Sequence, residues 1–217
     1  MKAEYISHMG DDLMVANVAR VSFAKESKEF TYRADKPNGS DEGIIEYLAK
    51  HNHWTPFAHP QIQFRMSAPV PIRTQCFKSK VGFVENEESR RYISSTPELF
   101  VPEYFRKAPE GNKKQGSFGI HERSDLWKKL YVKECSDIIA VYESMIEDGV
   151  APEQARFILP QGCEVNWIWT GSLAAYSRFC NLREDSHAQQ EIQILAKEID
   201  KILSDLFPVS WKALKCK

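Results

Sequence analysis

Five basic residues between positions 73 and 91 form the densest group of side chains that could bind a phosphate. They are Arg73, Lys78, Lys80, Arg90 and Arg91. Guanidinium and ammonium groups form charge-assisted hydrogen bonds with phosphate oxygens, and arginine does so through two N–H groups at once. Glutamates at positions 85, 87 and 88 lie among them. From the residues alone, a solvated charged surface is therefore an equally good interpretation.

Three histidines at positions 51, 53 and 59 form a second group. An H-x-H pair followed by a third histidine could ligate a metal ion such as zinc. No H-E-x-x-H motif accompanies them. This favours histidines that donate hydrogen bonds or stack on a planar ligand, and we expect no metal site.

A third polar segment, N-L-R-E-D-S-H-A-Q, occupies positions 181 to 189. Arg183 falls where a helix should end, and the helix dipole alone favours a cation there. The Asp-Ser-His run could belong to a hydrolase, but the chain has no G-x-S-x-G motif. It also lacks the glycine-rich motifs of P-loop and Rossmann proteins. A bound nucleotide would have to be held without such loops.

Arg156 lies one helical turn after Glu153. Residues three apart on a helix are neighbours, so a surface ion pair between the two explains this spacing without any ligand.

The elements that position these residues follow from hydrophobic periodicity and capping residues. Strands are expected over 2–9, 61–66 and 163–170. Helices are expected after a cap at Asp11 or Asp12, after Ser40 or Asp41, and from Pro69 or Pro71. Further helices should span 124–148, 153–158 and 172–182, and Ser186 should cap the last one. In the long helix we expect a core stripe of Leu126, Leu130, Ile138, Val141 and Met145. Few strands separated by helices and loops predict an α+β fold.

Length and composition set the class of protein. The 217 residues are 42% hydrophobic, enough for one domain over 1–217 with a sizeable core. The formal charge of −1 gives no bulk attraction to nucleic acid or membrane, and no apolar run could span a bilayer. The N-terminus shows no secretory signal, which favours the cytoplasm. The five cysteines contain no C-x-x-C pair and are expected to be buried thiols.

The motifs together resemble the flavin-dependent thymidylate synthases (ThyX type). The resemblance covers nearly the whole chain in the right order. It rests on A-R-V-S-F at 19–23, K-H-N-H-W-T-P-F at 50–57, Gln75, N-E-x-S-x-R-Y at 86–92, A-R-F-I-L-P at 155–160 and the segment 181–189. One departure is clear. The family signature begins Arg-His-Arg, whereas Lys78, Ser79 and Lys80 stand here and keep charge without the planar fork of arginine.

The resemblance implies a single domain with a mixed or antiparallel sheet flanked by helices, assembling as a homotetramer with shared active sites. It implies methylation of dUMP to dTMP, with methylenetetrahydrofolate as carbon donor, FAD as hydride carrier and NADPH as reductant. A catalytically impaired dUMP- and flavin-binding homologue is the alternative that the lysine departure motivates. A histidine metal hydrolase is a third.

The resemblance also implies site residues. C5 of uracil is a poor nucleophile, and it can be activated by a thiolate at C6 or by polarising the ring. By resemblance the polarising group is Arg183. The dUMP residues would be Gln75, Lys78, Glu87, Ser89, Arg90, Arg91, Glu153, Arg156 and Arg183, with Glu153 orienting Arg156. The flavin and folate residues would be His53, Thr55, Lys78, Ser79, Lys80, Glu87, Ser172, Leu173, Ala174, Arg178 and His187. Cys76, Cys163 and Cys180 are expected to be core thiols without a catalytic role.

Overall fold

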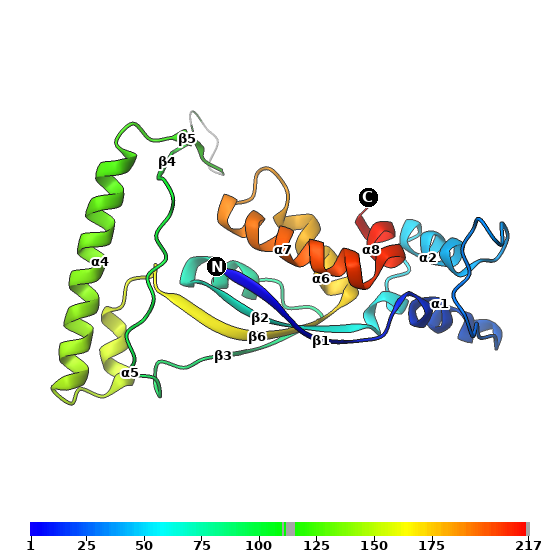
Figure 1. Cartoon of the computed structure of the whole chain (residues 1–217), viewed down its shortest axis with the longest axis horizontal. Coiled ribbons are helices and arrows are strands. Elements are labelled where there is room, and N and C mark those ends of the chain that lie inside the picture. The colour runs from blue at the N-terminus through cyan, green and yellow to red at the C-terminus, as the bar shows by residue number, and fades with distance from the viewer. Residues whose placement is uncertain (110, 112–115, 216–217) are drawn as a thin grey trace.

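The computed structural model describes residues 1–109, 111 and 116–215, and Figure 1 shows their arrangement. The Gly- and Lys-rich segment 110–117, whose composition predicts a loop, lies largely outside the described residues. Cys216 lies outside them as well.

A four-stranded antiparallel sheet with the order β1-β2-β6-β3 forms the centre of the molecule. Its strands are β1 (Lys2–Met9), β2 (Gln61–Pro69), β6 (Glu164–Ser172) and β3 (Phe83–Glu87). The first three confirm the expected strands. The sequence did not predict β3, because this edge strand buries only Phe83, which stacks on Trp169 at 4.1 Å. A two-stranded sheet of β4 (Arg106–Lys107) and β5 (Phe118–Ile120) lies apart from it.

The core lies on one face of this sheet. Alternate side chains of β2 and β6 are buried, as the period of two in a strand requires. Helices α6 (Leu173–Arg183) and α7 (Gln190–Leu206) lie along that face in Figure 1, and α3 (Val70–Phe77) follows β2 directly. Trp169 contacts Tyr176 and Phe179 of α6 edge-to-face. The sheet thereby holds the middle of α6 in place.

Capping residues explain where several helices begin. Asp11 caps α1 (Asp12–Arg20) and Ser40 caps α2 (Asp41–Lys50), as expected. The expected cap at Ser186 is wrong. Helix α7 begins at Gln190 after Gln189, because Asp185 closes a tight turn by accepting from the amide of His187 at 2.8 Å.

A separate C-terminal helix, α8 (Pro208–Lys215), was not predicted. The buried Phe207 leaves helical geometry with φ −133° and ψ 63°, and Pro208 starts a new helix. The carboxylate of Asp12 accepts from the amides of Val209 at 2.9 Å and Ser210 at 2.8 Å. The first helix of the chain therefore caps the last one.

The long helix α4 (Ser124–Glu147) confirms the expected span, and Gly149 follows it with φ 87°. The expected core stripe is wrong. Leu126, Leu130 and Val141 are exposed, and Ile138 and Met145 are only half-buried, whereas the buried side consists of Cys135, Ile139 and Tyr142. The reason is that α4 stands away from the sheet (Figure 1), beside α5 (Pro152–Ala155) and the 3-10 helix η3 (Arg156–Ile158).

The loop between the 3-10 helix η1 (Val21–Phe23) and α2 is anchored on Asp41, whose side chain is fully buried. Its carboxylate accepts from Arg20 Nε at 2.9 Å, Ser27 Oγ at 2.9 Å, and the amide and hydroxyl of Thr31 at 2.9 and 2.7 Å. Burial opposes ionisation, yet the hydrogen bonds from Thr31, Arg20 and Ser27 hold the pKa of Asp41 below its ordinary value.

Asp41→Asn is expected to lower the free energy of unfolding by about 3 kcal/mol, because it leaves Arg20 without its buried partner. Urea denaturation measures this, and Asp35→Asn in the exposed part of the same loop is the control. Because the folded-state pKa is depressed, the carboxylate's contribution is complete above its ordinary value of 3.8. It disappears as the pH falls through the folded-state pKa. Equal stability of both variants would contradict this anchoring role.

Candidate active site

Arg183 ends α6 where that helix meets α3. Its Nη2 donates to the carbonyl oxygen of Gln75 at 3.1 Å, and the Gln75 side chain donates to Gln189 Oε1 at 2.7 Å. The Nε of Arg183 is buried and has no hydrogen-bond partner among the described residues. An unsatisfied buried donor costs about 1–3 kcal/mol. This nitrogen therefore lacks the acceptor that burial calls for, although Arg183 itself lines none of the cavities described below.

A cavity of about 440 Å³, here called the arginine cavity, lies between α3, the end of β3 and η3. It brings together four of the expected dUMP residues, namely Glu87, Ser89, Arg90 and Arg156. Arg90 donates to the carbonyl oxygen of Ser95, and Arg156 donates to a carbonyl oxygen at 3.2 Å. Since neither of these contacts involves a carboxylate, both guanidinium groups keep their charge for an anionic ligand.

Arg73, one of the five basic residues that could bind a phosphate, also lines the arginine cavity, although the family resemblance did not place it in the site. Its Nε lies 2.8 Å from Glu87 Oε2, but the geometry leaves both buried atoms without a hydrogen bond. Burial raises the pKa of Glu87, the positive charge of Arg73 lowers it, and Glu88 raises it further. Arg73 belongs to the five basic residues between positions 73 and 91. Its closeness to Glu87, however, follows from the pairing of β3 with β6 and could not be read from the sequence.

Glu153 and Arg156 contact each other differently from the expectation. Arg156 Nε donates to the backbone carbonyl of Glu153, while the Glu153 carboxylate lies 3.6 Å from Arg91 Nε. Glu153 and Arg91 are both more than half exposed. They lie outside the arginine cavity, at its margin.

A second cavity, of about 660 Å³, lies beside α6 and is called here the α6 cavity. His53, Ala174 and Arg178, three of the residues predicted to contact flavin or folate, line it together with Trp54 and Leu214. Ser172 and Leu173 are placed differently. Ser172 accepts from the amide of Ala175 as the cap of α6, and Leu173 is fully buried.

The three residues Lys78, Ser79 and Lys80 lie between α3 and β3, next to the α6 cavity without lining it. Arg178 holds this loop through a hydrogen bond to the carbonyl of Val81 at 2.5 Å. At Gly82, with φ 83°, an added Cβ would approach the Ala175 side chain to 2.9 Å. The loop is thus pinned closely to α6. Lys78 is exposed, whereas Lys80 pairs with the carboxylate of Glu85 and lies over the Phe77 ring at 5.1 Å.

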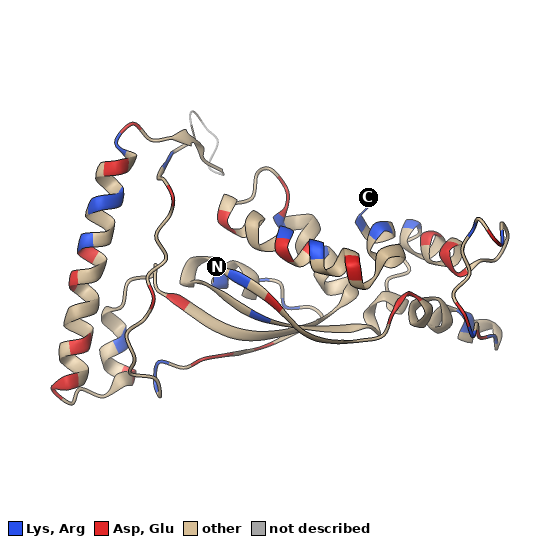
Figure 2. Cartoon of the chain, in the orientation of Figure 1, with Lys and Arg blue, Asp and Glu red and all other residues tan. Residues whose placement is uncertain are grey.

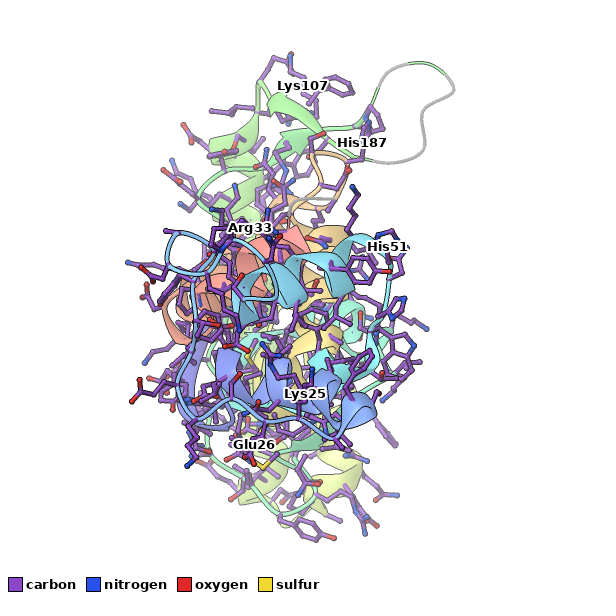
Figure 3. All side chains as sticks on the ribbon, turned by 90° about the vertical axis from the view of Figure 1, so that its right-hand side faces the viewer. Lys25, Glu26, Arg33, His51, Lys107 and His187 are labelled. Carbon is purple, nitrogen blue, oxygen red and sulfur yellow. The ribbon has the colours of Figure 1, made fainter. Side chains whose placement is uncertain are left out.

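A third cavity, of about 870 Å³, opens between α1, α2 and the 25–40 loop. His53 lines both this cavity and the α6 cavity, and Thr55 of the 3-10 helix η2 (Thr55–Ala58) lines this one. His187 lies in another part of the molecule, and Figure 3 shows it well above His51 in that view. The side chain of His187 is 81% exposed and bonds Asp185 at 2.9 Å. Within one chain the expected site residues therefore fall into separate places.

Tyr47, His51 and His53 form an aromatic group with ring centroids 4.3 to 6.5 Å apart. Among the described residues, no three histidine, cysteine or acidic side chains converge as metal ligands would. Among the helices that the structure describes, none combines the length and apolar character that a bilayer crossing requires.

Comparison with known proteins identifies the family. Residues 4–209 match the model of the family described as "Thymidylate synthase complementing protein". The flavin-dependent thymidylate synthase of Thermosipho africanus is 34% identical over 96% of this chain and 88% of that protein. The enzyme of the same name from Thermus thermophilus is 31% identical over 97% of this chain and 74% of that protein. The chain belongs to the flavin-dependent thymidylate synthases.

A solved structure agrees with this membership of the family. The UMP/dUMP methylase PolB from Streptomyces cacaoi, crystallised with 5-Br dUMP, superposes with a TM-score of 0.85 at 26% identity. The match covers 98% of this chain and 93% of that one. The α+β fold and the family resemblance predicted from the sequence are thereby confirmed.

The cysteines bear on how a member of this family could activate its substrate. Cys76, Cys135, Cys163 and Cys180 are buried free thiols, which confirms that the expected core thiols are enclosed. Burial raises the pKa of Cys76 to about 12, despite the opposing charge of Arg183, and that of Cys163 to about 11. Since the thiolate is the nucleophilic form, none of these four thiols is suited to attack a pyrimidine at neutral pH.

Proposed function

We propose that the chain catalyses the reductive methylation of dUMP to dTMP. Methylenetetrahydrofolate provides the carbon, FAD carries the hydride and NADPH restores the reduced flavin. The observation that carries the proposal is a buried Arg183 Nε without a hydrogen-bond partner among the described residues, near the buried thiol of Cys76, whose pKa burial raises to about 12. This combination favours electrostatic activation of the pyrimidine over covalent activation by sulfur.

The arginine cavity would hold the nucleotide. Arg90 and Arg156 would bind the 5′-phosphate, with the hydroxyl of Ser89 beside them and Arg91 at the margin. Glu87 would accept from the sugar or base, and Arg73 keeps that carboxylate in place. Gln75 and Lys78, at the end of α3, complete the set on the side of Arg183.

Arg183 would lie against the edge of the uracil. A fixed guanidinium stabilises the negative charge that develops on the ring when N3 ionises, and this makes C5 a better nucleophile. C5 then attacks the methylene carbon of the folate while the bond from that carbon to one folate nitrogen breaks. C5 afterwards loses its proton as the second carbon–nitrogen bond breaks, which releases tetrahydrofolate and leaves an exocyclic methylene group that can accept a hydride. The backbone of Gln75 keeps the guanidinium from rotating during this step.

The residues of the α6 cavity fit a flavin. His53 and Trp54 offer planar side chains, Ala174 leaves room against α6, and Arg178 offers a cation. Lys78, Ser79 and Lys80 border the cavity where a diphosphate would need positive charge and a hydroxyl group. When bound, FAD supplies the hydride that reduces the transferred carbon to a methyl group. His53 and Thr55, which line the neighbouring cavity as well, would hold the folate against it.

We also propose that the chain assembles as a homotetramer in the cytoplasm. The separation of His187 and Thr55 from the arginine cavity supports sites built from more than one subunit. The exposed α4 face, defined as Leu126, Trp127, Leu130 and Val141, supports the same idea. All four side chains are at least 39% exposed, and Leu126, Leu130 and Val141 lie on the side away from Cys135 and Tyr142. Figure 2 shows basic and acidic segments interspersed along the same helix.

The test of the assembly is Leu130→Glu, which places a charge in the exposed α4 face. Burying an unpaired carboxylate costs several kcal/mol, so the tetramer is expected to dissociate. Light scattering after gel filtration gives the mass, and Ser136→Glu on another side of α4 is the control. A wild-type mass of one chain would refute the assembly, and a tetrameric Leu130→Glu variant would refute the role of α4.

The test of the reaction uses the purified chain loaded with FAD. We expect dUMP to change the flavin absorbance, and dTMP to form when NADPH and methylenetetrahydrofolate are added. Binding of dUMP without dTMP would instead identify the impaired homologue. A chain that takes up no FAD would refute the proposed function.

A further inference from the structure

The C-terminal helix α8 packs against the end of α6 that carries Arg183. Lys215, in the last turn of α8, donates from Nζ to Glu184 Oε2 at 2.6 Å and to Asp200 Oδ1 at 3.0 Å. Glu184 directly follows Arg183, and Asp200 belongs to α7. A single ammonium group therefore joins three helices beside the proposed catalytic arginine.

Neighbouring side chains shield this contact from most of the solvent. The side chains of Lys215 and Glu184 are each 22% exposed and that of Asp200 is 31% exposed. Trp211 Nε1 also donates to Asp200 Oδ1 at 2.9 Å, and its ring lies under the ammonium group of Lys215 at 5.9 Å. Burial lowers the pKa of Lys215, but the hydrogen bonds to Glu184 and Asp200 outweigh it and raise the pKa overall. The ammonium form is thus retained at neutral pH.

Further contacts hold the same turn of α6. Asn181 Nδ2 donates to the carbonyl of Leu214 at 3.2 Å, and Cys180 Sγ lies 3.6 Å from the carbonyl of Ala196. On the opposite side, α3 holds the guanidinium of Arg183 through Gln75. The backbone at Arg183 is therefore fixed by α7 and α8, and its side chain by α3.

The position of this turn matters for the chemistry. A displacement of about 1 Å at a reacting group can cost about 100-fold in rate. If Lys215 lost its charge, the carboxylates of Glu184 and Asp200 would repel each other without compensation. Glu184 Oε1, which is buried and has no hydrogen-bond partner among the described residues, would favour a move toward solvent. Such a move would carry the end of α6 with it.

We propose that Lys215 is a positioning residue for Arg183. By holding Glu184 and Asp200 together, it fixes the end of α6 at which the guanidinium meets the pyrimidine. Leu214, its neighbour in α8, lines the α6 cavity, so the same helix also forms part of the wall of the proposed flavin site. The inference rests on the proposed function, because it concerns the geometry of that reaction.

The experiment compares full-length Lys215→Met, Lys215→Arg and Lys212→Met with the wild type. For Lys215→Met we expect kcat for dTMP formation to fall about 10-fold, with a change of less than about twofold in the KM for dUMP. The dUMP-induced change in flavin absorbance should shrink, at unchanged FAD content. Lys215→Arg should recover most of kcat, because a guanidinium reaches both carboxylates. Lys212→Met, an exposed lysine of the same helix, should match the wild type.

Glu184→Gln is the second variant, for use if Lys215→Met does not fold. It removes one of the two charges at nearly constant shape, and we expect it to lower kcat in the same direction. A lower melting temperature with unchanged kcat would overturn the inference and leave a purely structural contact. A lack of recovery in Lys215→Arg would overturn it as well. If the wild type forms no dTMP, the proposed function itself fails, which is a different outcome.

Discussion

Arg183→Ala is expected to reduce kcat for dTMP formation by about 10³-fold, the effect seen when a preorganised donor is removed from a developing negative charge. The fold should persist, because the side chain makes one hydrogen bond, to the carbonyl of Gln75, worth about 1 kcal/mol. Single-turnover formation of dTMP under saturating dUMP measures the chemical step, and flavin absorbance reports FAD retention.

Arg183→Lys distinguishes charge from geometry in this experiment. Lysine keeps the positive charge but loses the planar fork and the Nε donor, so we expect only a small part of the rate to return. Near-normal turnover in Arg183→Ala would refute the electrostatic role. In that case Cys76, the buried thiol on which the charge of Arg183 acts, would have to be examined as a nucleophile.

Arg156→Met is expected to raise the KM for dUMP about 10- to 100-fold, with a smaller effect on kcat. A hydrogen bond to a charged group contributes about 1.5–3 kcal/mol, and Arg156 is one of two cavity guanidinium groups that donate to carbonyl oxygens. Initial rates over a range of dUMP concentrations measure both constants.

The control is Arg65→Met, which changes an exposed arginine of β2 that lines none of the described cavities. A KM that shifts equally in both variants would indicate a general effect of charge. An unchanged KM in Arg156→Met would place the phosphate outside the arginine cavity.

Local rules predicted the elements whose signals lie within a few residues. The caps at Asp11 and Ser40 and the strand β2 are of this kind. The predictions were wrong where residues distant in the sequence determine the secondary structure or the buried side of an element. β3 buries a single residue and exists because β6 pairs with it. The apolar residues of α4 form a stripe, but the side that faces the chain is the one with Cys135 and Tyr142.

The sequence motifs named residues of the candidate site but not how they are arranged. The motifs identified Glu87, Ser89, Arg90 and Arg156, and the structure places these four around one cavity. The partnership of Arg73 with Glu87, and that of Lys215 with Glu184, could not be read from spacing. The former depends on the register of the sheet and the latter on a helix, α8, that local signals did not separate from α7.

The capping of α8 by Asp12 affects the order in which the chain folds. The amide of Val209 donates to a residue 197 positions earlier, nearly the longest separation that the chain allows. Contacts between such distant residues form slowly, since a large loop must close first. During synthesis, α1 is made long before α8. Lys215, which belongs to α8, therefore reaches Glu184 and Asp200 late in folding. Catalytic competence should therefore appear at the end of folding, after the sheet has acquired its native hydrogen bonds.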